Sequence, residues 1–172
     1  MPKNFFGYEY GLRKPISNTS ACTGGPASLT GSDCMIKRLG HVGIVIQDME
    51  KSLSQYQALF DLKPTAVVDA MGGKVRAAFV PVGDGEIELL QPLDESGPLM
   101  KYLREHGTGI HHISFTTDDI DGDVRRLRKE GVQFDRETPT VGAHGTRIIF
   151  TIPQSTDNVA IELMEETPRQ QT

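Results

Sequence analysis

Gly109–Phe115, with the sequence GIHHISF, reads as a β-strand, and Gly40–Ile46, with the sequence GHVGIVI, repeats it earlier in the chain. The two stretches superpose on His41 and His112, and several apolar positions that follow them also correspond. Self-similarity of this kind is typical of a duplicated structural unit. The repeat therefore sets the expected fold and singles out two histidines at equivalent places.

A second pair of matching stretches lies near the end of each repeat. Ile87–Leu90 has the sequence IELL, and Ile161–Met164 has the sequence IELM. Each stretch places a glutamate, Glu88 or Glu162, in an otherwise apolar strand. Each repeat thus begins with a strand that carries a histidine and ends with a strand that carries a glutamate.

The part of the chain from 36 to 166 is therefore expected to fold as two βαβββ modules. Module one spans 36–93, a connecting helical segment spans 94–107, and module two spans 108–166. One module alone forms a four-stranded sheet with a helix on one face and leaves the other face open. Two modules side by side form one curved, mixed sheet with a central cleft on its concave face. The predicted fold class is α+β.

Local signals place the individual elements. Asp48 is a helix N-cap, and apolar residues recur at helical spacing over Met49–Phe60. The equivalent helix of module two begins after Asp118 or Asp119 and ends near Gly131. The other expected elements are strands at 36–46, 65–68, 75–82, 86–91, 132–134, 147–152 and 159–164, and a short helix at 96–105.

The composition is that of an ordinary globular protein, with 37% hydrophobic residues, 24% charged residues and a net charge of −5. An acidic chain has no general affinity for nucleic acid, so no nucleic-acid partner is expected. No apolar run approaches the roughly 18 residues of a membrane span, so no membrane partner is expected. Cys22 and Cys34 are too few for a disulfide framework, which favours a reducing, cytoplasmic location.

The two ends of the chain differ from the part between them. Residues 1–35 are rich in Gly, Ser, Thr, Pro and Asn and show neither helical nor strand periodicity. This composition is typical of a flexible N-terminal tail. Residues 167–172 are expected to form a polar C-terminal tail. A chain that starts at Met35 is expected to fold and to keep its activity.

The repeated histidines and glutamates point to a metal site. His41 and His112 each have small neighbours on their own strand face, as the floor of a cavity requires. Glu88 and Glu162 must either face water or be paired, because an unpaired buried charge is very costly. If a two-fold axis relates the modules, all four side chains meet in the cleft, which becomes a metal-binding cleft. Two imidazoles and two carboxylates suit a divalent ion such as Co, Mn, Ni, Zn or Mg.

Each of these residues taken alone has a simpler reading. A lone strand histidine is more often structural, and a lone strand glutamate more often faces water. Four such residues at two matched places are hard to obtain by chance, which favours the metal site.

Other polar residues carry weaker signals. His111 lies next to His112 and, by strand alternation, is expected to face the opposite side, toward the helices. His144 lies in a glycine-rich turn, where an exposed loop position is favoured over closure upon a ligand. Lys74 and Arg76 either project into the cleft and meet an anion or line an exposed face, and the sequence leaves both alternatives open.

Several of these stretches together resemble the vicinal oxygen chelate superfamily (glyoxalase, bleomycin resistance and dioxygenase proteins) and, within it, the methylmalonyl-CoA epimerase family. The resemblance covers most of the chain after the N-terminal tail. Its Gly-x-His-His-Ile and Glu-Leu-Leu-x-Pro-Leu pieces are fairly specific in combination. The stretches that carry it are Leu39–Val45, Phe79–Gly83, Ile87–Leu93, Gly109–Ile113, Asp118–Ile120, Gly142–Gly145 and Ile161–Leu163.

This resemblance implies an isomerase, a metal-dependent epimerase that interconverts (R)- and (S)-methylmalonyl-CoA by α-proton abstraction through a metal-stabilised enolate. It also implies an acyl-CoA substrate, a homodimer, and one divalent metal ion held by His41, Glu88, His112 and Glu162. Glu162 is the candidate for one acid/base group. The second group is unassigned, because Arg76 stands where some members carry a catalytic glutamate, and an arginine stays protonated.

Three alternatives stay open beside this reading. A lactoylglutathione lyase-like isomerase would use the same scaffold and a similar metal site. A dioxygenase favours iron held by two histidines and one carboxylate, so four protein ligands argue against it. A metal-free small-molecule binding protein would not need the matched set of histidines and glutamates.

Overall fold

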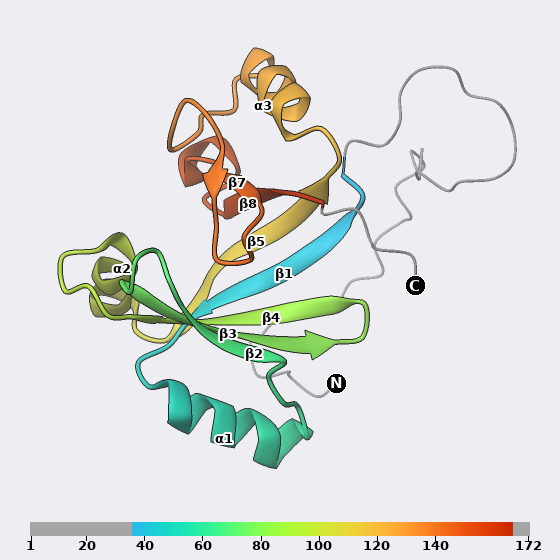
Figure 1. The fold of residues 1–172 in the computed structure, drawn as a ribbon. Coiled ribbons are helices and arrows are strands. Elements are labelled where there is room, and N and C mark those ends of the chain that lie inside the picture. Colours follow the sequence, from blue (N-terminus) through green and yellow to red (C-terminus); the bar gives the residue numbers. More distant parts are fainter. Residues whose placement is uncertain (1–35, 167–172) are drawn as a thin grey trace, which may run out of the picture. The chain divides into compact units, whose positions relative to one another are not determined.

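A computed structural model describes residues 36–166 of the chain. The tails expected at 1–35 and 167–172, together with Cys22 and Cys34, lie outside this part. Within it, eight strands form one sheet and three α-helices pack around that sheet (Figure 1). No helix of the described part is long and apolar enough to cross a membrane.

Module one has the predicted order of elements. These are β1 (Arg38–Val45), α1 (Met49–Phe60), β2 (Ala66–Ala70), β3 (Val75–Val82) and β4 (Gly85–Pro92). The side chain of Asp48 accepts a hydrogen bond from the backbone N–H of Lys51 at 3.0 Å and thereby caps the first turn of α1. The boundaries of this helix therefore match the prediction from the sequence.

Module two repeats the same order after α2 (Pro98–His106), which connects the modules. In module two, the side chain of Asp119 accepts a hydrogen bond from the backbone N–H of Gly122 at 2.9 Å and thereby caps the helix that begins at Ile120. The elements of module two are β5 (Gly109–Thr117), α3 (Ile120–Lys129), β6 (Thr140–Val141), β7 (Arg147–Phe150), the 3-10 helix η1 (Pro153–Ser155) and β8 (Ala160–Glu165).

The sheet has the strand order β2-β3-β4-β1-β5-β8-β7-β6. In its middle, β1 and β5 run antiparallel, and each is parallel to the last strand of its own module, β4 or β8. The order of strands is therefore the same in both directions from the centre, as expected for two modules related by a two-fold axis. The predicted α+β fold, a curved mixed sheet built from two βαβββ modules, is confirmed.

Strand alternation divides the side chains of β4 and β8 between the two faces of the sheet. Leu89 packs in the apolar cluster under α1, and Leu163 packs in the equivalent cluster under α3. Glu88 and Glu162 lie one residue away on the same two strands, so they face the opposite, inner side. Helices α1 and α3 thus cover the outer face of their own halves of the sheet (Figure 1), whereas α2 packs through Leu99 against the inner-face cluster that contains Leu90.

The pairing of the two central strands is interrupted beside the repeated histidine of β5. Gly43 of β1 pairs with His112, whereas the next residue, Ile44, pairs with Ile110. His111 is therefore an extra residue without a partner on β1, which is a β-bulge. Strict alternation fails at such a point, so the sequence pattern could not fix the direction of the His111 side chain.

A corresponding irregularity lies in β1. Leu39 pairs with Phe115 and Val42 pairs with Ile113, so β1 has one more residue than β5 in this interval. His41 lies inside it. Bulges redirect side chains and are frequent next to active sites. The strand pairing is thus irregular at His41 in β1 and next to His112 in β5, the two histidines of the repeat.

The structure differs from the predicted elements mainly in the second half of module two. Instead of a strand at 132–134, only Phe134 makes an isolated bridge, with Thr151. The short strand β6 was not predicted, because two residues at a sheet edge show no period-two pattern. The last hairpin is interrupted by η1, since Pro153 and the following residues form a 3-10 turn between β7 and β8.

Candidate metal centre

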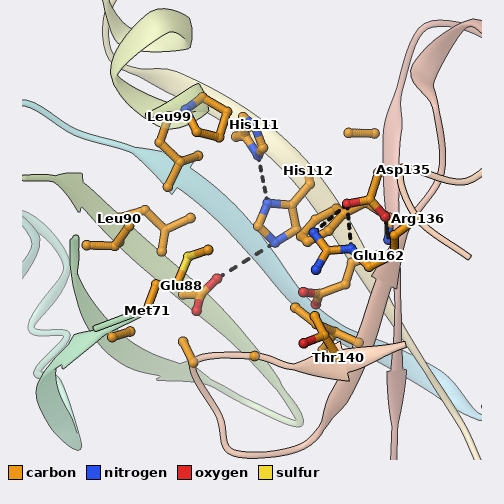
Figure 2. Close-up of a pocket in the computed structure, with 18 of the residues that line it drawn as sticks. Met71, Glu88, Leu90, Leu99, His111, His112, Asp135, Arg136, Thr140 and Glu162 are labelled. Carbon is orange, nitrogen blue, oxygen red and sulfur yellow. Dashed lines mark hydrogen bonds and ion pairs between the residues drawn. The ribbon is translucent and has the colours of Figure 1, made fainter. Parts of the chain in front are cut away.

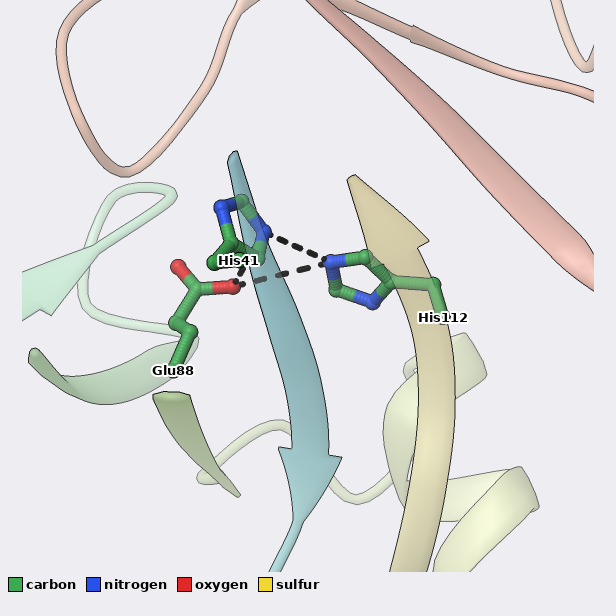
Figure 3. Close-up of side chains that lie close together, drawn as sticks. All are labelled: His41, Glu88 and His112. Carbon is green, nitrogen blue, oxygen red and sulfur yellow. Dashed lines mark hydrogen bonds and ion pairs between the residues drawn. The ribbon is translucent and has the colours of Figure 1, made fainter. Parts of the chain in front are cut away.

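The two repeated histidines meet where β1 and β5 pair at the centre of the sheet (Figure 3). Nε2 of His41 lies 3.0 Å from Nε2 of His112. Both side chains are buried, with 1% and 2% of their surface exposed. The duplicated strands therefore bring two imidazole nitrogens to one point, as the repeat predicts.

The two repeated glutamates approach the same point from the outer neighbours of these strands. Glu88 Oε2 lies 3.4 Å from His41 Nε2 and 3.7 Å from His112 Nε2. The ligand atoms of these three residues all lie within 4.8 Å of one another. Glu162 Oε2 lies 3.2 Å from His41 Nε2, but Glu162 is not a member of that close group of three. Three of the expected ligands thus form one cluster, and the fourth lies against His41.

Burial and mutual contact set the protonation of this cluster. Burial raises the pKa of Glu88 to about 7, although nearby His41 opposes the shift. Burial lowers the pKa of His112 to about 3, so this imidazole is neutral at pH 7. Burial also disfavours a charge on His41 and on Glu162, but their mutual contact and the neighbouring charges outweigh it. The pKa of His41 is consequently raised and that of Glu162 lowered.

The arrangement of these atoms fits a divalent cation. His41 and His112 direct two ring nitrogens at each other across 3.0 Å, where at most one of them can donate a proton. Glu162 Oε2 is buried and makes no hydrogen bond of good geometry with any described residue. Its contact is the His41 ring at 3.2 Å, which does not satisfy a buried carboxylate oxygen as a well-formed hydrogen bond would. Nitrogen and oxygen atoms gathered in this way match the donor sets of Zn²⁺ and similar ions.

A cavity of about 410 Å³ opens beside the cluster (Figure 2). Glu88, His112 and Glu162 line one part of its wall. Most of the other lining side chains are apolar, among them Leu90 and Leu99. A small ligand bound there would contact the candidate metal ligands while apolar walls shield it from water.

His111 lines the same cavity as His112, which corrects the expectation that it faces the opposite side. Its Nδ1 lies 3.0 Å from Nδ1 of His112. Its ring also packs edge-on against Tyr102 of α2, with 5.0 Å between the ring centres, as the expected contact with a helix requires. The β-bulge accounts for both observations, because the extra residue turns toward the cavity mouth instead of alternating.

His144 is not the exposed loop residue that the sequence favoured. Its ring stacks on His41, with 5.1 Å between ring centres and 24° between planes, and it packs against Phe79 at 4.2 Å. Its Nε2 lies 3.4 Å from Glu86 Oε1. Burial lowers the pKa of His144 to about 4, so the ring is neutral at pH 7. The glycine-rich turn therefore folds over the cluster and covers one side of His41.

Lys74, which directly precedes β3, and Arg76 of β3 do not line the cavity. Arg76 Nε binds Asp69 Oδ1 at 3.1 Å, and Lys74 Nζ lies 3.5 Å from Asp94 Oδ2. Val75 lines the cavity, so strand alternation directs Arg76 away from it, and the side chain of Lys74 in the preceding turn is 65% exposed. The exposed-face alternative is the one that the structure shows.

Two charged residues of the cavity wall were not identified from the sequence. Asp135 and Arg136 lie in the irregular loop between α3 and β6 and line the cavity near His112 and Glu162 (Figure 2). The equivalent connection in module one, between Phe60 and Ala66, is shorter, so the repeat offered no matching positions for these two residues. Their only sequence signal is an acidic and a basic residue placed next to each other.

Comparison with known proteins places the chain in a family. Residues 40–150 match the family model described as the Glyoxalase/Bleomycin resistance protein/Dioxygenase superfamily. The chain belongs to this superfamily. The match to the superfamily includes His41, Glu88 and His112, and Glu162 follows its end.

Several relatives and solved structures are named methylmalonyl-CoA epimerase. The chain is 32% identical over 155 residues to the mitochondrial methylmalonyl-CoA epimerase of Homo sapiens, and the match covers 88% of each chain. It is 33% identical over 131 residues to the ethylmalonyl-CoA/methylmalonyl-CoA epimerase of Cereibacter sphaeroides, covering 75% of this chain and 98% of the relative. A variant of Streptomyces coelicolor methylmalonyl-CoA epimerase, solved in complex with 2-nitronate-propionyl-CoA, has a TM-score of 0.74 at 29% identity, covering 77% and 99%. The resemblance inferred from the sequence is confirmed.

Proposed function

We propose that this chain is a metal-dependent epimerase that interconverts (R)- and (S)-methylmalonyl-CoA. The observation that carries the proposal is the buried convergence of His41, Glu88 and His112 within 4.8 Å. That cluster lies in a chain related over most of its length to proteins named methylmalonyl-CoA epimerase. A cavity of about 410 Å³ beside the cluster offers space for the acyl end of a thioester.

The metal would be held by His41, Glu88, His112 and Glu162, the residues of the repeat. When bound there, a divalent ion would supply Lewis-acid polarisation of the thioester oxygen, which makes the neighbouring C–H bond more acidic. The donor set suits Co, Mn, Ni, Zn or Mg. Glu162 is the proposed acid/base residue, because it lines the cavity, lies outside the close group of three and contacts that group through His41 at 3.2 Å.

In this proposal the carboxylate of Glu162, a residue of the cavity wall, accepts the α-proton. Apolar walls, including Leu90 and Leu99, shield the reacting carbon from bulk water. Inversion also requires a proton donor on the opposite face of the α-carbon. Arg76 cannot provide it, since its side chain is directed away from the cavity and pairs with Asp69. The second group therefore stays unassigned.

Two further parts of the proposal concern the oligomeric state and the cellular location of the enzyme. We propose a homodimer, on the strength of the family resemblance. We also propose a cytoplasmic location, from the low cysteine content. The human relative is named mitochondrial, so fractionation of cells that express the full chain is the direct test of location.

The decisive experiment follows α-proton exchange of methylmalonyl-CoA in deuterated water by NMR, with and without a chelator. We expect rapid exchange by the metal-loaded protein, loss of exchange on chelation and recovery when metal is returned. His41→Ala and Glu162→Gln should each lower both metal content and exchange. His106→Ala and Glu105→Gln, two exposed residues outside the cluster, serve as matched controls. Unchanged metal content and turnover in the first two variants would refute the site.

A further inference from the structure

Arg136 lines the same cavity as the candidate metal ligands Glu88, His112 and Glu162 (Figure 2). Its Nε and Nη2 both donate to Oδ2 of Asp135, at 2.9 Å and 2.6 Å. The other carboxylate oxygen of Asp135 accepts from the backbone N–H of Phe150 at 3.2 Å. The guanidinium is thus fixed to strand β7 through one intermediate carboxylate.

The loop that carries Arg136 is itself held in place. Arg128 of α3 donates to the backbone carbonyls of Arg136 and Glu137, each at 2.9 Å. The same guanidinium lies 5.6 Å from the ring centre of Phe134, which bridges to Thr151. The backbone around position 136 is therefore fixed before any ligand binds, which is how a recognition residue avoids an ordering cost.

The guanidinium of Arg136 retains unused hydrogen-bonding capacity. Arginine has five N–H donors, and Asp135 takes up two of them. No other residue of the described part accepts a hydrogen bond from this side chain. Its side chain is 42% exposed and belongs to the cavity wall, so a ligand in the cavity can approach it. A planar fork of this kind is suited to a carboxylate or a phosphate.

We propose that Arg136 binds an oxyanion of the substrate, and specifically the free carboxylate of the acyl group, so that it selects carboxylated acyl thioesters over neutral ones. This inference rests on the proposed function, because it assumes an acyl thioester in the cavity. Arg136 shares the cavity with His112 and Glu162, which places it near the acyl end of such a ligand. The phosphates of CoA are the other source of the same chemistry.

Binding of three probes to the metal-loaded full chain separates these sources. Malonyl-CoA carries both a carboxylate and phosphates, acetyl-CoA carries phosphates alone, and malonyl-pantetheine carries a carboxylate alone. Each is titrated by calorimetry against wild type, Arg136→Gln, Arg136→Lys and Arg76→Gln. The last variant is the matched control, since Arg76 is 41% exposed and paired with an aspartate but directed away from the cavity.

For Arg136→Gln we expect roughly tenfold to hundredfold weaker binding of both malonyl thioesters, the usual effect of losing a charge-assisted hydrogen bond. Binding of acetyl-CoA and of the metal should stay at the wild-type level. Arg136→Lys should retain part of the affinity, because it keeps the charge and loses the fork. Arg76→Gln should match wild type with all three probes.

Two results would overturn the inference. If Arg136→Gln weakens both CoA esters and leaves malonyl-pantetheine unaffected, the residue binds a phosphate and the carboxylate assignment is wrong. If Arg136→Gln behaves like Arg76→Gln with every probe, the residue has no role in anion binding. Both results are independent of turnover, so they are distinguishable from a failure of the proposed epimerase activity, which wild-type proton exchange measures.

Discussion

The imidazole of His112 lies directly over the Cα of Gly43, its partner on the neighbouring strand. A Cβ atom at position 43 would occupy the space that this ring already fills. The glycine is therefore required by the close approach of a side chain and not by an unusual backbone conformation. One residue without a side chain allows the second histidine to reach the first.

Gly43→Ala is expected to displace the His112 ring and to weaken metal binding at least tenfold. Overpacking of this kind usually costs about 1–3 kcal/mol of stability as well. Gly85→Ala is the matched control, because a Cβ there would meet only a carbonyl oxygen at 3.7 Å. Chelator competition gives the metal Kd, and thermal unfolding gives the stability. Equal metal affinity in the two variants would contradict the close approach.

Metal affinity should depend on pH near neutrality. Burial raises the pKa of Glu88 to about 7, and the pKa of His41 is raised as well, so protons compete with the metal for these ligands. Below about pH 7, where Glu88 is protonated, each displaced proton should weaken apparent metal affinity about tenfold per pH unit. The affinity should level off once the pH exceeds the pKa values of both Glu88 and His41. His112, with its pKa lowered to about 3, adds no competition in this range.

The measurement for this prediction is the metal Kd between pH 5.5 and 8.5 in wild type and in Glu88→Gln. The amide has no proton to displace, so the variant should bind more weakly overall but with a shallower pH slope. A slope identical to that of wild type would show that Glu88 does not titrate on metal binding.

His111 is expected to support metal binding through His112. If Nε2 of His112 faces a cation, its proton lies on Nδ1, and Nδ1 of His111 at 3.0 Å must accept it. Burial lowers the pKa of His111, which keeps it neutral and able to accept. His111→Leu should therefore weaken metal binding about tenfold to hundredfold, the usual effect of losing a partner of a metal ligand. His111→Gln, which retains an acceptor, should weaken metal binding less than His111→Leu does. The control variant His106→Leu should bind metal as tightly as wild type.

A chain that begins at Met35 is predicted to fold and to retain metal binding and activity. Every strand of the sheet and every described apolar cluster belongs to residues 36–166, so the fold has its own core. Circular dichroism, thermal unfolding and the proton-exchange assay compare the shortened and the full chain. A shortened chain that fails to fold would show that the predicted boundary at 35 is wrong.

The duplication explains how much was accessible from the sequence. It predicted both modules, their pairing and the four repeated residues, because a repeat reports equivalent positions whatever their spacing along the chain. The convergence of His41 and His112 followed from two strands meeting at the centre. Capping by Asp48 was equally local and was confirmed.

The parts that escaped prediction have a common physical cause. His111 turns into the cavity at a bulge, and a bulge is a defect in the very alternation from which its direction was inferred. His144 and Arg136 lie in loops whose course depends on long-range contacts, such as the stacking of His144 on His41. Neither loop carries a periodic signal, so only the folded chain shows that both enclose the same cavity.

The candidate ligands are divided evenly between the modules, with His41 and Glu88 from the first and His112 and Glu162 from the second. Neither module possesses a complete set, so a bound cation would link the two modules across the β1–β5 interface. Occupancy of the metal site would then report whether the two modules are paired. Separation of β1 from β5 would release the ion before the strands under α1 or α3 need to unfold.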